Sequence, residues 1–411
     1  MYVLALLLVL LGGPQDMPPM DHSMHSMEHA TEPAPLEPHT RMGSGTAWQP
    51  EDTPMHAVHW QLGKWSLTTH GLLFLVYDRQ GGPRGVTQGA APNWFMTMGT
   101  RPLGPGDLQA RVMLSLDPAT MAARGYPELF QVGESFHGQP LVDIQHPHDF
   151  FMEVAGIYTW RLGARTGLQV YAAPVGEPAL GPVAFPHRES AADLPMAVLG
   201  HHQQDSTHIA FGVLTGGLIA GNFKVEGSWF NGHEPDEQRW GFDPIHLNST
   251  SARVSYALGT SWVFQASRGW LDSPEALEPG QDVTRTTASA LFSHGSVAAA
   301  LILGRNEQEG AHQDGLDLEG TWTFASKNHV FGRFERVDRT PEVTVQAWTL
   351  GAGRDLGSVF TLPLTLGTAF TLYRKPDVLD PVYGDEPVSF YLYLRLRAPR
   401  MAMEHGAAHV H

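Results

Sequence analysis

The segment FKVEGSWF, residues 223–230, alternates between apolar and polar side chains. Its Phe, Val, Gly and Trp residues interleave with Lys, Glu and Ser. Successive side chains of a β-strand point to opposite faces of a sheet, so the segment predicts a strand with one apolar and one charged face. The same alternation recurs in residues 107–117, 317–324 and 390–397. The dominant pattern of the chain is therefore that of β-structure.

Reading the alternation along the whole chain predicts sixteen strands between residues 64 and 398. They lie at 64–78, 92–101, 107–117, 150–163, 167–175, 207–217, 222–231, 250–259, 261–271, 284–293, 296–305, 315–325, 328–338, 344–355, 358–374 and 387–398. Tight connections alternate with longer ones, which places turns and loops at opposite ends. An even number of strands of about ten residues with this arrangement is typical of outer-membrane proteins. The chain resembles that family, which implies an all-β, antiparallel, up-and-down transmembrane barrel of about 16 strands, within a range of about 14–18.

A soluble β-barrel, sandwich or propeller is the structural alternative, in which the apolar faces would point inward. Two features favour the membrane barrel instead: the polar face mixes opposite charges, and the apolar face carries tryptophans near strand ends, as aromatic girdles do. These tryptophans are Trp94, Trp160, Trp229, Trp262 and Trp322. The polar face, which would line the lumen, carries Arg111, Lys224, Glu226, Arg253, Asp317, Glu319, Arg333, Glu335, Arg395 and Arg397.

The amino-acid composition excludes some classes of function and favours export from the cytoplasm. With 411 residues and a formal net charge of −16, the chain lacks the positive charge that nucleic-acid binding needs. The absence of cysteine excludes disulfides and thiolate metal sites, whereas 22 His and 15 Met are unusual. Residues 1–16 predict a signal peptide. We further expect a disordered Met/His-rich periplasmic tail at 17–63, the barrel at 64–398 and a Met/His-rich C-terminal tail at 399–411.

The N-terminal tail carries the first candidate metal ligands. They are Met17, Met20, His22, Met24, His25, Met27 and His29. Thioethers select Cu(I), and imidazole accepts both oxidation states of copper, so this mixture without cysteine favours copper. A Met/His-rich tail before a barrel is similar to the bacterial copper-resistance protein B family, which implies copper sequestration or passage and periplasmic copper proteins as partners. The barrel itself resembles a widespread group of bacterial proteins of no assigned activity.

The long loops carry the second candidate site. Its residues are His146, His148, Asp149, His187, His201, His202, Asp205 and His208. Because these loops share one end of the barrel, their imidazoles and carboxylates are expected to meet and to hold a Zn, Cu or non-haem Fe ion. The alternative is that they anchor loops that fold inward and plug the lumen. Glu234, in a later loop, is expected to be solvated.

The sequence thus predicts a barrel in the outer-membrane lipid that binds or passes a transition metal, with copper favoured. A porin-like channel for small solutes is the alternative function. A metal-dependent enzyme built on the loop histidines is a third, although the chain has no phosphate-binding Gly loop, nucleophile elbow or His-Glu-x-x-His motif. We therefore expect no catalytic site.

Overall fold

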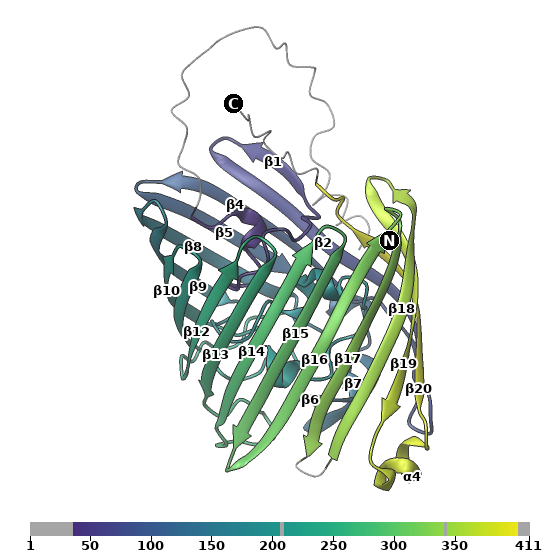
Figure 1. Ribbon diagram of the computed structural model, residues 1–411. Helices are drawn as coiled ribbons and strands as arrows, with labels where there is room; N and C mark the ends of the chain where they lie inside the picture. The colour runs from purple at the N-terminus through teal and green to yellow at the C-terminus, as the bar shows by residue number, and fades with distance from the viewer. Residues whose placement is uncertain (1–35, 206–208, 341–342, 402–411) are drawn as a thin grey trace.

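The computed structural model describes residues 36–205, 209–340 and 343–401. Sixteen of its strands close into an antiparallel barrel, as the sequence predicts (Figure 1). In order round the barrel they are β2 (Trp65–Arg79), β4 (Asn93–Leu103), β5 (Gly106–Leu114), β8 (Phe151–Gly163), β9 (Thr166–Val175), β10 (Val213–Ala220), β11 (Phe223–Phe230), β12 (Ser249–Leu258), β13 (Trp262–Leu271), β14 (Val283–His294), β15 (Val297–Gln308), β16 (Ala311–Phe324), β17 (Asn328–Thr340), β18 (Val343–Val359), β19 (Leu362–Arg374) and β20 (Val388–Arg397). Pairing of β20 with β2 closes the cylinder.

The remaining elements are short and do not belong to the sixteen-stranded wall, although β1 and β3 each pair with β2. The strands are β1 (Val58–Leu62), β3 (Thr87–Ala90) and a separate hairpin of β6 (Tyr126–Phe136) and β7 (Gln139–Gln145). The helices are η1 (His39–Arg41), α2 (Asp117–Thr120), η2 (Phe185–His187), η3 (Glu189–Ala191), α3 (His201–Gln204), η4 (Asp377–Leu379) and α4 (Asp380–Tyr383). In the described part of the chain, no helix has the length and apolar character of a membrane span.

The two ends of the barrel differ. Tight turns such as 163–166 and 220–223 define one end, here called the turn end. The connections at 79–93, 114–151 and 175–213 emerge at the opposite end, here called the loop end, where α4 also lies (Figure 1). Two predicted longer connections at the loop end are instead tight hairpins, because β15 and β16 extend to residues 308 and 311 and β17 and β18 to 340 and 343.

The outer surface of the wall is apolar and the inner surface polar. On β11, the side chains of Val225 and Trp229 are 50% and 51% exposed, whereas those of Lys224 and Glu226 are buried inside. A soluble barrel would show the opposite arrangement, because its outer surface must be hydrated. The outward apolar face can be covered only by lipid, so the chain is a transmembrane barrel.

The girdle tryptophans are distributed as expected, with one exception. Trp160, Trp229, Trp262 and Trp322 are exposed on the outer surface. Trp94 is buried, and its ring contacts that of His187 in a tilted arrangement at a centroid distance of 4.3 Å. The prediction for Trp94 was wrong because the long connection between β9 and β10 folds into the lumen and supplies an apolar and aromatic surface there.

That connection, residues 176–212, is here called the inner loop. Arg188 donates hydrogen bonds to Glu319 and Asp317 on β16, at 2.7 and 3.1 Å. Asp193 accepts a hydrogen bond of 2.7 Å from Arg395 on β20. Charged side chains of the wall therefore bind the inner loop across the lumen, which is the plugged arrangement that the sequence left open.

A second segment closes the turn end. It comprises residues 36–57 of the tail that was expected to be disordered over 17–63, and for these residues the expectation is wrong. Glu37 is buried and accepts hydrogen bonds from Lys224 Nζ at 2.9 Å and from Trp48 Nε1 at 2.6 Å. Asp52 accepts a hydrogen bond from Ser261 Oγ, at a tight turn between strands. The segment is poor in core residues of its own, but it folds because the barrel wall supplies its partners.

Candidate functional site

Four imidazoles gather at the loop end, inside the barrel. They belong to His146 and His148, which follow β7, and to His201 and His202, which lie on α3. Ring centroids are 5.8 Å apart for His146 and His201, 5.8 Å for His146 and His202, and 4.1 Å for His201 and His202. His148 lies 6.3 Å from His146. We call these four residues the histidine cluster.

Each ring of the histidine cluster is oriented by an acceptor at Nδ1. For His146 the acceptor is Glu134, at 3.1 Å, and for His201 it is the carbonyl oxygen of Val198, at 2.8 Å. The remaining two acceptors are Asp117, 2.8 Å from His148, and Glu234, 2.9 Å from His202. An acceptor at Nδ1 requires the proton there, which places the lone pair of each neutral ring on Nε2. Carboxylate partners of this kind orient imidazoles that bind metals.

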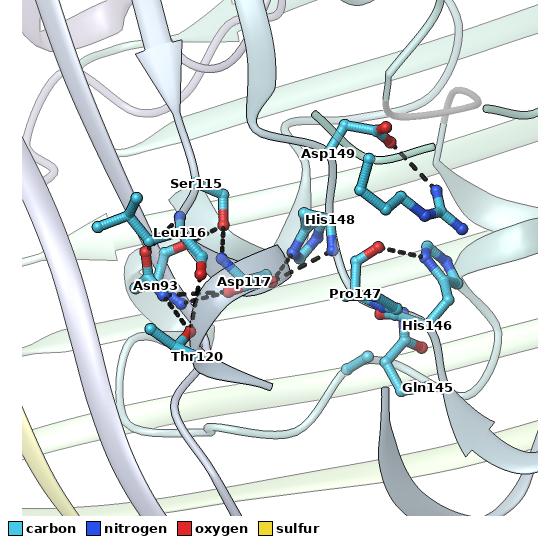
Figure 2. A network of polar contacts seen from close by, with 12 residues as sticks. Asn93, Ser115, Leu116, Asp117, Thr120, Gln145, His146, Pro147, His148 and Asp149 are labelled. Atoms are coloured by element: carbon cyan, nitrogen blue, oxygen red, sulfur yellow. Dashed lines mark hydrogen bonds and ion pairs between the residues drawn. The ribbon is translucent and has the colours of Figure 1, made fainter. Parts of the chain in front are cut away.

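Asp117 shows how the local fold builds this orientation (Figure 2). The chain leaves β5 at Leu114, and Asp117 begins α2 with Pro118 directly behind it. One carboxylate oxygen of Asp117 accepts hydrogen bonds from the backbone and side-chain nitrogens of Asn93, at 3.0 and 3.2 Å. The other accepts from the backbone nitrogen of His148 at 3.2 Å and from its ring. The fully buried carboxylate is thus fixed from both sides.

The donor atoms are close enough for a shared ion. One ring nitrogen each of His146, His201 and His202 lie within 4.8 Å of one another. A second group of donors, His202 with Glu234 and Glu275, satisfies the same distance. His202 joins the two groups, and its Nε2 has no hydrogen-bond partner among the described residues. Three imidazoles with nearby carboxylates suit Zn, Cu or non-haem Fe.

The second group of donors combines two carboxylates with the ring of His202, and Arg285 lies near all three. The negative charge of Glu234, followed by burial, raises the pKa of Glu275 to about 7. Burial also raises the pKa of Glu234 to about 7 and lowers the pKa of His202. The carboxylates of Glu234 and Glu275 thus repel each other beside the neutral ring of His202. A bound metal ion would relieve this repulsion.

Asp149 and Asp205, two predicted ligands, serve other partners. Asp149 accepts a hydrogen bond of 3.1 Å from Arg239, and its pKa is raised to about 7 by burial despite that charge. Asp205 lies 3.7 Å from Arg188, and burial raises its pKa to about 6. Both carboxylates therefore belong to ion pairs that hold loops, so the structure does not bring them into the histidine cluster.

His187 also lies apart from the histidine cluster. Its ring contacts that of Trp94, and burial lowers its pKa to about 3. His208 lies outside the described residues, as do the predicted ligands of the N-terminal tail. Those are Met17, Met20, His22, Met24, His25, Met27 and His29.

Several functional residues were missed from the sequence. Asp117, Glu134 and Glu275 carry no distinctive local motif, and Glu234 was wrongly expected to be solvated. Its side chain is only 9% exposed, because its loop folds over α3 and places the carboxylate against His202. The only sequence signal for these residues is that each lies in a connection at the loop end, as the histidines do.

Comparison with known proteins supports the fold. No protein-family model matches the chain, and no curated protein does. An anion-selective porin from Comamonas acidovorans superposes with a TM-score of 0.52 and 12% identity, covering 81% of this chain and 99% of that one. OmpF of Salmonella typhi, in a complex with daunomycin, gives 0.51 and 9%, with 83% and 100% covered. The outer-membrane channel DcaP of Acinetobacter baumannii gives 0.51 and 7%, with 82% and 98% covered.

The fold and the apolar outer surface together define the class of this protein. It is a porin-like β-barrel of the bacterial outer membrane.

Proposed function

We propose that this protein is a porin-like channel of the outer membrane whose lumen is closed by its own chain and which holds a transition-metal ion at the histidine cluster. The observation that carries the metal is the convergence of His146 from one loop with His201 and His202 from another, with donor atoms within 4.8 Å. Hydrogen-bond anchors alone would not need three imidazoles to share one point.

The channel part of the proposal is supported by the wall and by the porin and channel named among the structural neighbours. A sixteen-stranded barrel is wide enough for an aqueous lumen unless segments fill it. Here the inner loop and residues 36–57 fill it, and the backbone nitrogen of Ala184 donates a hydrogen bond of 2.9 Å to Ser44 Oγ between them. Passage of a solute therefore requires the two segments to move together. In outer-membrane barrels short turns face the periplasm, which would place the Met/His tails there and the histidine cluster on the outside.

Copper remains the favoured metal on the composition of the terminal tails, since thioethers prefer Cu(I). The histidine cluster itself, with nitrogen and oxygen donors, suits Zn(II) and Cu(II) equally well. A metal-dependent enzyme would require turnover of a substrate. Assays of hydrolysis and redox turnover by the metal-loaded protein would test that alternative.

The test compares metal stoichiometry between matched histidine variants of the full chain in detergent. The cluster variants are His201→Ala and His202→Ala, and the control is His312→Ala, which removes an exposed imidazole on β16. Calorimetric titration with Zn(II) and Cu(II) should show one equivalent less for each cluster variant and no change for the control. Because all variants keep the tails, the difference reports the cluster alone. Equal stoichiometry in all proteins, with unchanged affinity, would contradict the metal site.

A further inference from the structure

A second group of metal-ligating side chains lines a cavity deeper in the barrel, away from the carboxylates of the histidine cluster. The cavity has a volume of about 100 Å³ and lies between residues 36–57, the wall strands β2 and β4, and η2 of the inner loop. Its lining includes four methionines and four histidines, the latter being His39, His56, His70 and His187. We call the set Met42, Met55, His70, Met96, Met98 and His187 the thioether chamber.

The wall side of the chamber follows from strand register. In the pairing of β2 with β4, His70 lies opposite Met96 and Thr68 lies opposite Met98. Residues directly opposite in an antiparallel pair have Cβ atoms about 4.5–5.5 Å apart, and positions two residues apart share a face. Met96 and Met98 are both buried on the lumenal face. One imidazole and two thioethers are therefore fixed side by side by the backbone.

The inner loop supplies the opposite side. The ring of His187 lies 6.2 Å from that of His70 and contacts the ring of Trp94 at a centroid distance of 4.3 Å. The Nε2 atoms of His70 and His187 are buried and have no hydrogen-bond partner among the residues that the structure describes. A buried polar atom without a partner costs roughly 1–3 kcal/mol. Two such atoms on residues that line one cavity point to a ligand, and a neutral imidazole with its proton on Nδ1 offers the lone pair of Nε2 to a metal ion.

The charges at the edge of the chamber do not oppose a cation, because each is neutralised. Arg397 pairs with Glu189 at 3.2 Å, and Arg188 pairs with Glu319 at 2.7 Å. The ligating side chains of the chamber, thioethers and neutral imidazoles, carry no net charge themselves. Hard divalent ions prefer charged oxygen donors, whereas a soft monovalent ion is stabilised by thioether and imidazole.

We propose that the thioether chamber is a second metal site, selective for a soft monovalent ion such as Cu(I), with Met96, Met98, His70 and His187 as its ligands. Met42 and Met55, on the segment that closes the turn end, lie where they can complete the coordination. This site does not depend on metal binding at the histidine cluster. It goes beyond the proposed function by placing a soft-metal site within the barrel, separate from the Met-rich tails.

Packing is the alternative role for the methionines, and water is the alternative occupant. The same buried hydrophobic cluster also contains Met113 and Met152, which do not line the cavity. If the methionines only fill space, Met96 and Met113 should be equivalent, since both are almost fully buried and lie opposite each other on β4 and β5. Met113 therefore provides a matched control.

The experiment measures Cu(I) binding to the full chain in detergent without oxygen, by competition with a chromophoric Cu(I) chelator. The test variant is Met96→Leu with Met98→Leu, and the control is Met113→Leu; leucine is close to methionine in volume, so these changes conserve packing. The test variant should bind one equivalent of Cu(I) less than the wild type, while the control should match it. Zn(II) stoichiometry should be the same in all three proteins. X-ray absorption at the copper edge should show fewer sulfur neighbours in the test variant.

Two outcomes would overturn the proposal. One is unchanged Cu(I) stoichiometry and affinity in the test variant, which would leave packing and water as the explanation. The other is an equal loss in the Met113→Leu control, which would mean that repacking and not ligation is responsible. The variant His202→Ala separates the two proposals, because it should lose Zn(II) at the histidine cluster and keep Cu(I) in the thioether chamber.

Discussion

Replacing Arg188 with methionine should open the barrel, because this residue is the centre of the ion pairs that hold the inner loop. Its side chain is 2% exposed, and its guanidinium lies 2.7 Å from Glu319 and 3.1 Å from Asp317. Without it, two fully buried carboxylates would share Arg333, which lies 3.0 Å from Glu319 but 3.9 Å from Asp317. Removing one partner of a buried ion pair costs about 3–5 kcal/mol.

Most of this cost falls on the closed state, because departure of the inner loop lets water reach both carboxylates. The open population should therefore rise by about two to four orders of magnitude. Single-channel recording in planar bilayers measures the fraction of time spent in a conducting state. The control is Arg268→Met, which removes a pair 3.2 Å from Glu307 in which both side chains are more than 40% exposed, worth about 0.2–1 kcal/mol.

The refuting result is a folded Arg188→Met protein, with native circular dichroism, that conducts no more than Arg268→Met. A second variant keeps the test interpretable if the single variant fails to fold. Combining Arg188→Met with Glu319→Gln removes one of the two buried carboxylates that lose their partner. It should fold better than the single variant and conduct at an intermediate level. Conductance equal to wild type in both variants would show that the ion pairs do not hold the loop in place.

Three further predictions follow from other contacts. Burial raises the pKa of Glu177 from an ordinary 4.5 to about 8, so the folded state binds this proton more tightly than the unfolded state does. The stabilisation from this proton is full below about pH 4.5 and is lost as pH rises through 8. The melting temperature should therefore fall more between pH 5 and pH 9 in wild type than in Glu177→Gln. Lys224→Met leaves the buried Glu37 without its cation, at a cost of about 3–5 kcal/mol. Limited proteolysis should then cut within residues 36–57. An uncut segment would contradict the role of Lys224 in anchoring it. Replacing the tail methionines with leucine should weaken Cu(I) binding more than Zn(II) binding, and equal losses would argue against thioether ligation; the positions are Met17, Met20, Met24 and Met27.

The wall of the barrel could be predicted because its signal is local. In β11, the alternation of residues 223–230 indicates which face of the sheet each side chain takes, and the same alternation marks the other strands of the sixteen-stranded wall. The contents of the lumen could not be predicted in the same way. Glu37 and Lys224 are 187 residues apart, and neither flanking sequence indicates the other. Composition suggested disorder for residues 36–57 because it measures only whether a segment can build its own core.

The candidate site shows the same division. Clustered histidines in loops at one end predicted that imidazoles would meet, and His146, His201 and His202 do meet. His187 does not join them, because the turn at η2 directs its ring toward Trp94 on the wall. The carboxylates that orient the rings come from separate connections, and only the folded chain brings Glu234 to His202.

Each proposed metal site takes ligands both from the inner loop and from other parts of the barrel, so metal binding is coupled to the position of the inner loop. His201 and His202 of one site, and His187 of the other, lie on the inner loop, whereas His146 and His70 do not. An ion bound across these parts stabilises only the closed barrel, by about 2.7 kcal/mol when its concentration is one hundred times Kd. Breaking the Arg188 ion pairs costs the closed barrel about 3–5 kcal/mol, which is a similar amount. Bound metal would therefore offset much of the effect of Arg188→Met on the equilibrium between closed and open barrel. By linkage, opening of the lumen must weaken metal binding to the same extent, so Arg188→Met should release metal as it conducts.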